Sequence, residues 1–93
     1  MLISHAVGED VLHVTLHCDL DVANRAAAAL QIQALVQAHR PARVVIELPA
    51  ADPTPATISA LARAHRMCAS LSIPFSLAGA SPRTRRLLDV NSS

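Results

Sequence analysis

The feature that most constrains the fold is a short run of β-branched residues between two segments of helical period. Residues 43–48 read Arg-Val-Val-Ile-Glu-Leu, a pattern typical of a central strand covered on both faces. Before this run, residues 22–40 place apolar side chains at helical spacing. After it, Thr54 supplies a capping hydroxyl and Pro55 suits a first helical position, so a second helix is expected over about 55–71. A strand between two helices predicts right-handed crossovers and parallel neighbours.

Further elements are expected at the two ends of the chain. Two apolar stretches, 1–7 and 11–18, are separated by Gly-Glu-Asp, and the second alternates apolar with polar side chains, which predicts a β-hairpin. Residues 73–78 predict a short strand, and Ser-Pro at 81–82 predicts the start of a third helix. We therefore expect an α/β layered domain spanning 1–93, with a mixed four-stranded sheet and three helices in the order β-β-α-β-α-β-α.

The composition narrows the class of protein. Hydrophobic residues make up 52% of the chain and charged residues 16%, which predicts a packed core and a weakly charged surface. The net charge is +1 and Phe75 is the single Phe, Trp or Tyr, so a nucleic-acid-binding protein is not expected. The longest apolar run, 26–30, is too short to span a bilayer, and we expect a cytoplasmic protein without membrane insertion. With so little charge to keep copies apart, a homodimer or a stable complex with another protein is expected.

The chemically reactive side chains match no catalytic or metal-binding motif. Cys18 and Cys68 form no CxxC pair, and both thiols are expected to pack in the core. His13 and His17 share one face of the second strand, but a metal site needs more ligands. His65 lies on an apolar stripe and is expected to be a hydrogen-bonded core histidine. We therefore expect no metal, no cofactor and no enzymatic activity.

The second helix is apolar over a wider arc than one sheet face should cover. Leu61 belongs to the stripe that is expected to face the core. A second stripe beside it contains Ala60, Ala64 and Met67. Such a stripe either binds a partner protein or is covered by another part of the chain, and the sequence leaves both possibilities open.

Four stretches, in this order and spacing, resemble the STAS domain family, the fold of bacterial anti-sigma factor antagonists. Residues 17–21, His-Cys-Asp-Leu-Asp, are similar to the family's Ser-Gly-Glu-Leu-Asp at the end of the second strand. Residues 44–48 resemble its central strand, 60–66 the helix after its regulatory site, and 81–88 its third helix. The resemblance covers roughly residues 11–90 and implies a STAS-like fold with a role in signalling and transcription regulation.

The sequence departs from the family at the regulatory site. Members that act as phospho-switches carry Asp-Ser-Ser-Gly-Leu at the start of the second helix, where a partner kinase phosphorylates the second serine. Residues 54–58 here read Thr-Pro-Ala-Thr-Ile. Alignment on the helix puts Ala56 at the acceptor position and Thr54 in the capping role of the family Asp, and we favour it. Alignment on the central strand instead makes Thr57 the phosphoacceptor candidate, and neither alignment keeps the serine.

The resemblance implies a bacterial regulatory domain that binds an anti-sigma factor or a kinase-like protein without the serine switch. The alternatives are an accessory subunit of a lipid-exporting ABC transporter and a sensor that binds a small ligand or nucleotide at the second helix's N-terminus. Asp19 and Asp21 are expected to cap the first helix, with Asp21 as N-cap. The candidate partner-binding residues are Asp19, Asp21, Thr54, Thr57, Ala60, Ala64 and Met67.

Overall fold

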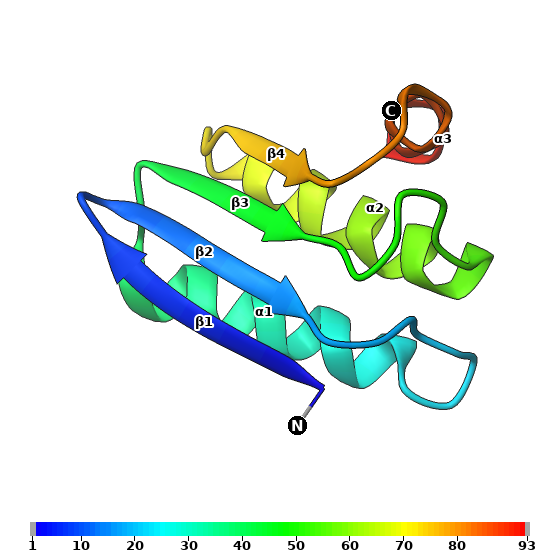
Figure 1. Cartoon of the computed structure of the whole chain (residues 1–93). Coiled ribbons are helices and arrows are strands. Elements are labelled where there is room, and N and C mark those ends of the chain that lie inside the picture. Colours follow the sequence, from blue (N-terminus) through cyan, green and yellow to red (C-terminus); the bar gives the residue numbers. More distant parts are fainter. Residues whose placement is uncertain (1, 93) are drawn as a thin grey trace.

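The computed structural model describes residues 2–92, in which a four-stranded sheet is combined with three helices (Figure 1). The strands lie in the order β1-β2-β3-β4, with β1 antiparallel to β2 and the other neighbouring pairs parallel. The expected α/β fold, with its mixed sheet and its order of elements, is therefore confirmed. The elements are β1 (Ile3–Gly8), β2 (Val11–Leu16), α1 (Arg25–His39), β3 (Arg43–Glu47), α2 (Pro55–Ser70), β4 (Phe75–Ala78) and α3 (Pro82–Ser92).

A tight turn joins β1 to β2. Gly8 pairs with Val11, so the turn itself consists of Glu9 and Asp10, whose φ angles are 53° and 64°. Two central residues at positive φ characterise a type I′ turn, whose twist matches that of the flanking strands. The Asp10 carbonyl accepts a hydrogen bond from the Ala42 N–H at 2.7 Å, which ties this turn to the chain just before β3.

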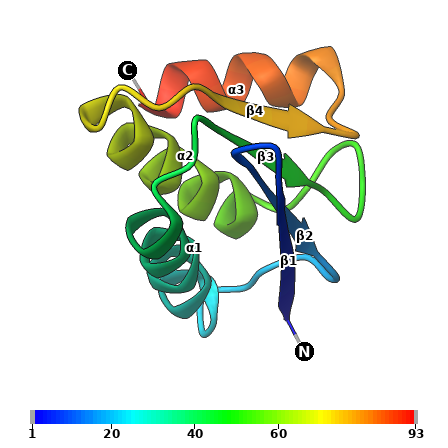
Figure 2. The same ribbon diagram turned by 90° about the vertical axis from the view of Figure 1, so that its left-hand side faces the viewer.

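The helices α1 and α2 cover one face of the sheet, and α3 packs beside α2 (Figure 2). On the covered face Val14 and Ile46 are fully buried. On the other face Val45 is half-buried and Glu47 is exposed, so the expectation that residues 43–48 are covered on both faces is wrong. The connections from β2 to β3 and from β3 to β4 are right-handed crossovers that move across the sheet in the same direction. Their helices therefore lie on the same face of the sheet, and the second face stays open.

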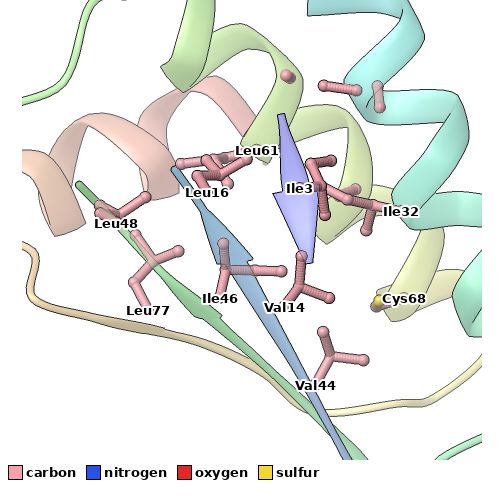
Figure 3. Packing of buried hydrophobic residues seen from close by; sticks show 14 of the residues in the cluster. Ile3, Val14, Leu16, Ile32, Val44, Ile46, Leu48, Leu61, Cys68 and Leu77 are labelled. Atoms are coloured by element: carbon pink, nitrogen blue, oxygen red, sulfur yellow. The ribbon is translucent and has the colours of Figure 1, made fainter. Parts of the chain in front are cut away.

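Strand and helix side chains together form the core between the two layers. Val14 and Ile46 come from the sheet, whereas Ile32 comes from α1 and Leu61 from α2, and all four are fully buried (Figure 3). Ile3 extends the core to the first strand at 2% exposure. This packing fixes the positions of α1 and α2 against the sheet, and with them the loops at the carboxyl ends of β2 and β3. Within residues 2–92, no helix combines the length and apolarity needed to cross a membrane.

The helix starts agree with the sequence in two cases and differ in one. Thr54 caps α2 as expected, and Ser81 caps α3 by accepting the Thr84 N–H at 3.1 Å. The prediction that Asp21 is the N-cap of α1 is wrong, because α1 begins later, after Asn24. The Asp21 carboxylate instead accepts the Asn24 N–H at 3.0 Å and closes a turn that precedes the helix.

Candidate functional site

Hydrogen bonds join the loop after β2 to the first turn of α2. The Thr54 hydroxyl donates to the Leu20 carbonyl at 2.8 Å, and the Thr54 N–H donates to Oδ1 of Asp19 at 3.1 Å. These segments meet because β2 and β3 are parallel neighbours, so the loops that follow them leave the same edge of the sheet. We call Asp19, Leu20, Thr54 and Thr57 the Asp19–Thr57 cluster.

Thr57 lies at the centre of this cluster and has no exposed surface. Its Oγ1 accepts the Leu20 N–H at 2.8 Å and donates to Oδ1 of Asp19 at 3.0 Å. A kinase needs an accessible hydroxyl, and this one is buried with both its donor and acceptor capacity in use. Phosphorylation of Thr57 would therefore require the cluster to open.

The other residues of the expected regulatory site take defined places around Thr57. Thr54 accepts the Thr57 N–H at 3.3 Å, which confirms the prediction that its hydroxyl caps α2. Ala56 is half-buried in the first turn of α2. The expectation that Asp19 caps α1 is wrong, since its carboxylate binds Thr54 and Thr57 of α2's first turn.

The proposed partner stripe on α2 is placed differently from what the sequence suggested. Ala60 and Ala64 are 3% and 2% exposed, because α1 packs alongside α2 and covers them. The prediction that these alanines are exposed for a partner is wrong, and the alternative that another helix covers them is correct. Met67 is half-buried and packs against the core cluster.

A groove of about 510 Å³ lies between α2 and α3, beside the Asp19–Thr57 cluster. Its lining includes the buried side chains of Ile58 and Ala62 from α2, and Leu87 of α3, which is 41% exposed. Near the carboxyl ends of both helices, Nη1 of Arg66 donates to the Asn91 carbonyl at 2.8 Å. The groove therefore has a mixed apolar and polar lining, and a hydrogen bond crosses it at this end.

The other end of this groove is held by the loop between β3 and α2. Oδ1 of Asp52 accepts hydrogen bonds from the hydroxyls of Ser81 at 2.6 Å and Thr84 at 3.3 Å, and the Thr84 hydroxyl also lies 2.7 Å from the Ala51 carbonyl. Thr84 is 1% exposed. The start of α3 is thus fixed to the same loop that leads into α2, which holds the two walls of the groove together.

A smaller groove of about 250 Å³ lies between α1 and α2. Arg25 and Ala29 line it from α1, and Ser59 and Arg63 line it from α2. Ser59 is exposed and also lines the α2–α3 groove. It therefore marks the ridge between the two grooves.

Positive charge is concentrated on the helical side of the molecule. The helices α1 and α2 carry Arg25, Arg63 and Arg66 and contain no Asp or Glu, and Arg83 of α3 lines the α2–α3 groove. The nearest carboxylate in that groove, Asp52, is already hydrogen-bonded. The net charge of +1 thus conceals a face whose side-chain charges are mostly positive.

The cysteines and histidines are spread over separate parts of the molecule. Cys18 is exposed, so the expectation that its thiol is packed in the core is wrong. Cys68 is fully buried as expected, and burial raises the pKa of its thiol to about 11. His17 pairs with the Ser4 hydroxyl at 2.8 Å, and half-buried His65 stacks on Phe75 with ring centroids 5.1 Å apart. No group of three or more His, Cys, Asp or Glu residues within residues 2–92 is placed to hold a metal ion.

Sequence reasoning missed several residues of this region. Asp52 could have been singled out as the one acid in a loop framed by prolines, and Thr84 by its spacing of three from Ser81. Ser59 and Arg66 had no such signal, because their importance comes from the position of α3 beside α2.

Comparison with known proteins supplies no relative for this site. No model of a known protein family matches the chain, and no curated protein matches it either. Any proposal of function therefore rests on the resemblance of the sequence and on the geometry of the site.

Proposed function

We propose that this chain is a STAS-type regulatory domain that binds an anti-sigma factor or a kinase-like protein in the bacterial cytoplasm. The observation that carries the proposal is the groove between α2 and α3. It lies beside the turn of α2 where the resemblance places the regulatory site. Leu87, which is 41% exposed, offers an apolar contact in this groove, and Arg66 and Arg83 in its lining favour an acidic partner surface.

The proposed binding is constitutive. The acceptor position given by the alignment on the helix is Ala56, which has no hydroxyl. The other candidate, Thr57, has no exposed surface. In phospho-switched members of the family, added phosphate charge breaks the complex, and neither position here offers an accessible group to receive it.

The alternative of a phosphate or nucleotide sensor is less well supported. A helix N-terminus binds phosphate through its free N–H groups. In the first turn of α2, Pro55 has no N–H and the Thr57 N–H is bonded to the Thr54 hydroxyl. The Ile58 N–H is bonded to the Thr54 carbonyl at 3.0 Å. Ala56 alone is left to donate in this turn, which is too few donors for a phosphate cradle.

The test is calorimetric titration of the protein with purified anti-sigma factors from its own bacterium. We expect one of them to bind without ATP-dependent phosphorylation of this chain. Ser59→Glu, on the ridge between the grooves, should weaken that binding by roughly tenfold or more, because it places a negative charge opposite an acidic partner. Ser70→Glu is the matched control, since Ser70 is exposed near the other end of α2 and lines neither groove.

Three outcomes would count against this function. The first is that no anti-sigma factor or kinase-like protein binds. The second is that Ser59→Glu binds as well as Ser70→Glu, which would move the contact away from the grooves. The third is binding to a transporter ATPase instead, which would favour the accessory-subunit alternative.

A further inference from the structure

Within residues 2–92, no segment pairs with the outer edge of β1. β1 is an end strand, and Figure 1 shows no element beyond it. Gly8 and Val11 flank the two-residue turn and form a hydrogen-bonded pair. Because such pairs alternate along an antiparallel ladder, Ala6 and Ser4 also bond to β2. The bond from the His17 N–H to the Leu2 carbonyl, at 3.1 Å, follows this alternation. The residues whose N–H and C=O groups point away from the sheet are therefore Ile3, His5 and Val7.

This edge lacks the features that normally prevent strands from pairing with other chains. Protected edge strands carry lysine, proline, inward charges or bulges. β1 reads Ile-Ser-His-Ala-Val-Gly and pairs with β2 at every position without a bulge, and Val7 is 48% exposed. The opposite edge is protected, since β4 is preceded by Pro74 and Nη2 of Arg85 donates to the Leu77 carbonyl at 3.0 Å.

The flank of α1 beside this edge is also uncharged. The His39 ring lies 5.7 Å from the His5 ring, which places the end of α1 against β1. Arg25 and Ala29 line the groove between α1 and α2, so they mark the side of α1 that faces α2. The flank on the opposite side of α1 contains Gln31 and the residues three, four and seven positions after it. No charged side chain occurs in residues 26–38, although the outer face of a surface helix is normally charged. The residues of this outer flank are Gln31, Ala34, Leu35 and Ala38, of which Leu35 is half-buried and the others are exposed.

We propose that this surface is a homodimer interface, in which β1 pairs antiparallel with β1 of a second copy of this chain. A two-fold axis at His5 places Ile3 opposite Val7 of the second copy, and it places His5 opposite His5 of the second copy. Only this register uses all the outward-pointing groups, with each opposed pair exchanging two backbone hydrogen bonds. An antiparallel pair about a two-fold axis is self-complementary, as a closed dimer requires. The two α1 flanks then meet beneath the joined strands without bringing like charges together.

The mass in solution, measured by sedimentation equilibrium from micromolar to millimolar protein, tests this interface. The wild type should reach twice its chain mass of 9.8 kDa. Ala34→Glu adds a charge to the α1 flank and should give a monomer. Ala26→Glu is the matched control, because Ala26 is an exposed alanine that lines the groove toward α2, and it should remain a dimer. Val7→Pro removes an outward N–H, leaves the bonds to β2 in place and should also give a monomer.

A cross-linking experiment tests the register. His5→Cys in a Cys18→Ser background should form a covalent dimer on mild oxidation, because Cα atoms in a hydrogen-bonded pair are about 5.5 Å apart, within reach of a disulfide. The remaining thiol, Cys68, is buried.

A wild type that stays monomeric throughout, or dimers that persist in both Ala34→Glu and Val7→Pro, would overturn the interface. Dimers that fail to cross-link through position 5 would overturn the register. Self-association needs no other protein. The dimer can therefore be disproved while the proposed function holds, and the proposed function can be disproved while the dimer holds.

Discussion

At the scale of single residues, Thr57 links two segments that are distant in sequence. Its hydroxyl accepts a hydrogen bond from the buried Leu20 N–H in the loop after β2, and Thr57 itself belongs to the first turn of α2. We therefore assign Thr57 a structural role, in which it joins that loop to the start of α2.

Thr57→Val should destabilise the protein by about 1–3 kcal/mol, because it leaves the Leu20 N–H and the Asp19 carboxylate without their partner at nearly unchanged volume. Urea unfolding followed by circular dichroism measures this, since the chain has no Trp or Tyr to report by fluorescence. Thr15→Val is the matched control on the open face of the sheet, where the side chain is half-buried, and it should change the free energy of unfolding little. Equal effects of the two substitutions would contradict the role given to Thr57.

Cys68 should make stability depend on alkaline pH. Burial raises the pKa of its thiol from 9.0 to about 11, so the folded state keeps the proton that the unfolded state releases. This contribution to stability is fully present below pH 9 and is lost as the pH rises toward 11. The chain contains no Lys and no Tyr, so neither of these side chain types contributes to a change in this window. Unfolding experiments from pH 8 to about 11 should therefore show a declining free energy of unfolding.

The two cysteines provide the controls for this pH dependence. Cys68→Ala should be less stable at neutral pH but should lose the decline between pH 9 and 11. Cys18→Ser should retain the decline, because Cys18 is exposed. A decline that survives in Cys68→Ala would show that another group causes it.

At the scale of secondary-structure elements, the contact between α1 and α2 depends on small side chains. Ala29 of α1 and Ala60 and Ala64 of α2 are all at most 3% exposed. Small residues let two helix backbones approach closely, and the same composition looks like an open apolar stripe when the sequence is read without its neighbour. The sequence alone therefore does not distinguish a partner-binding surface from a surface covered by another helix.

Ala64→Leu should destabilise the protein by about 1–3 kcal/mol, because the larger side chain cannot be accommodated between the helices without displacement. Ala69→Leu makes the same change at an exposed position of α2 and should shift the free energy of unfolding by less than about 0.5 kcal/mol. Thermal and urea unfolding of both variants measures the difference. If Ala64→Leu were as stable as Ala69→Leu, the close packing of α1 on α2 would be in doubt.

Most elements could be predicted from the sequence because each depends on a local signal. The alternation in β2, the Thr54-Pro55 start of α2 and the Ser81 cap of α3 all lie within a few residues of the element that they define. The start of α1 lies later in the chain than predicted, because Asp21 is a good capping residue for a turn as well as for a helix. The prediction for β3 is wrong on one face, because the helices of both crossovers lie on the same side of the sheet. No local sequence pattern shows on which side these helices lie.

At the scale of the whole molecule, the two faces of the sheet have different characters. The helical side carries the grooves and an excess of arginine, whereas the open face shows His13, Thr15 and Glu47 with no helix over them. The candidate site could be predicted only in part, because the Thr54 cap is local but both grooves arise where separate helices meet. The difference in charge between the two sides could not be predicted for a similar reason. A net charge of +1 does not show on which side of the sheet the arginines lie.

The position of α1 and α2 on a single side of the sheet has a consequence for valency. Two copies joined at β1 about an axis perpendicular to the sheet would carry their helices on the same side, so both α2–α3 grooves would face the same way. A partner that is itself dimeric could then occupy both grooves at once, and its second contact would be intramolecular. Such linkage can raise overall avidity roughly 100- to 10,000-fold over a single contact. A groove of modest affinity would therefore suffice for a long-lived complex, provided that the partner also comes as a pair.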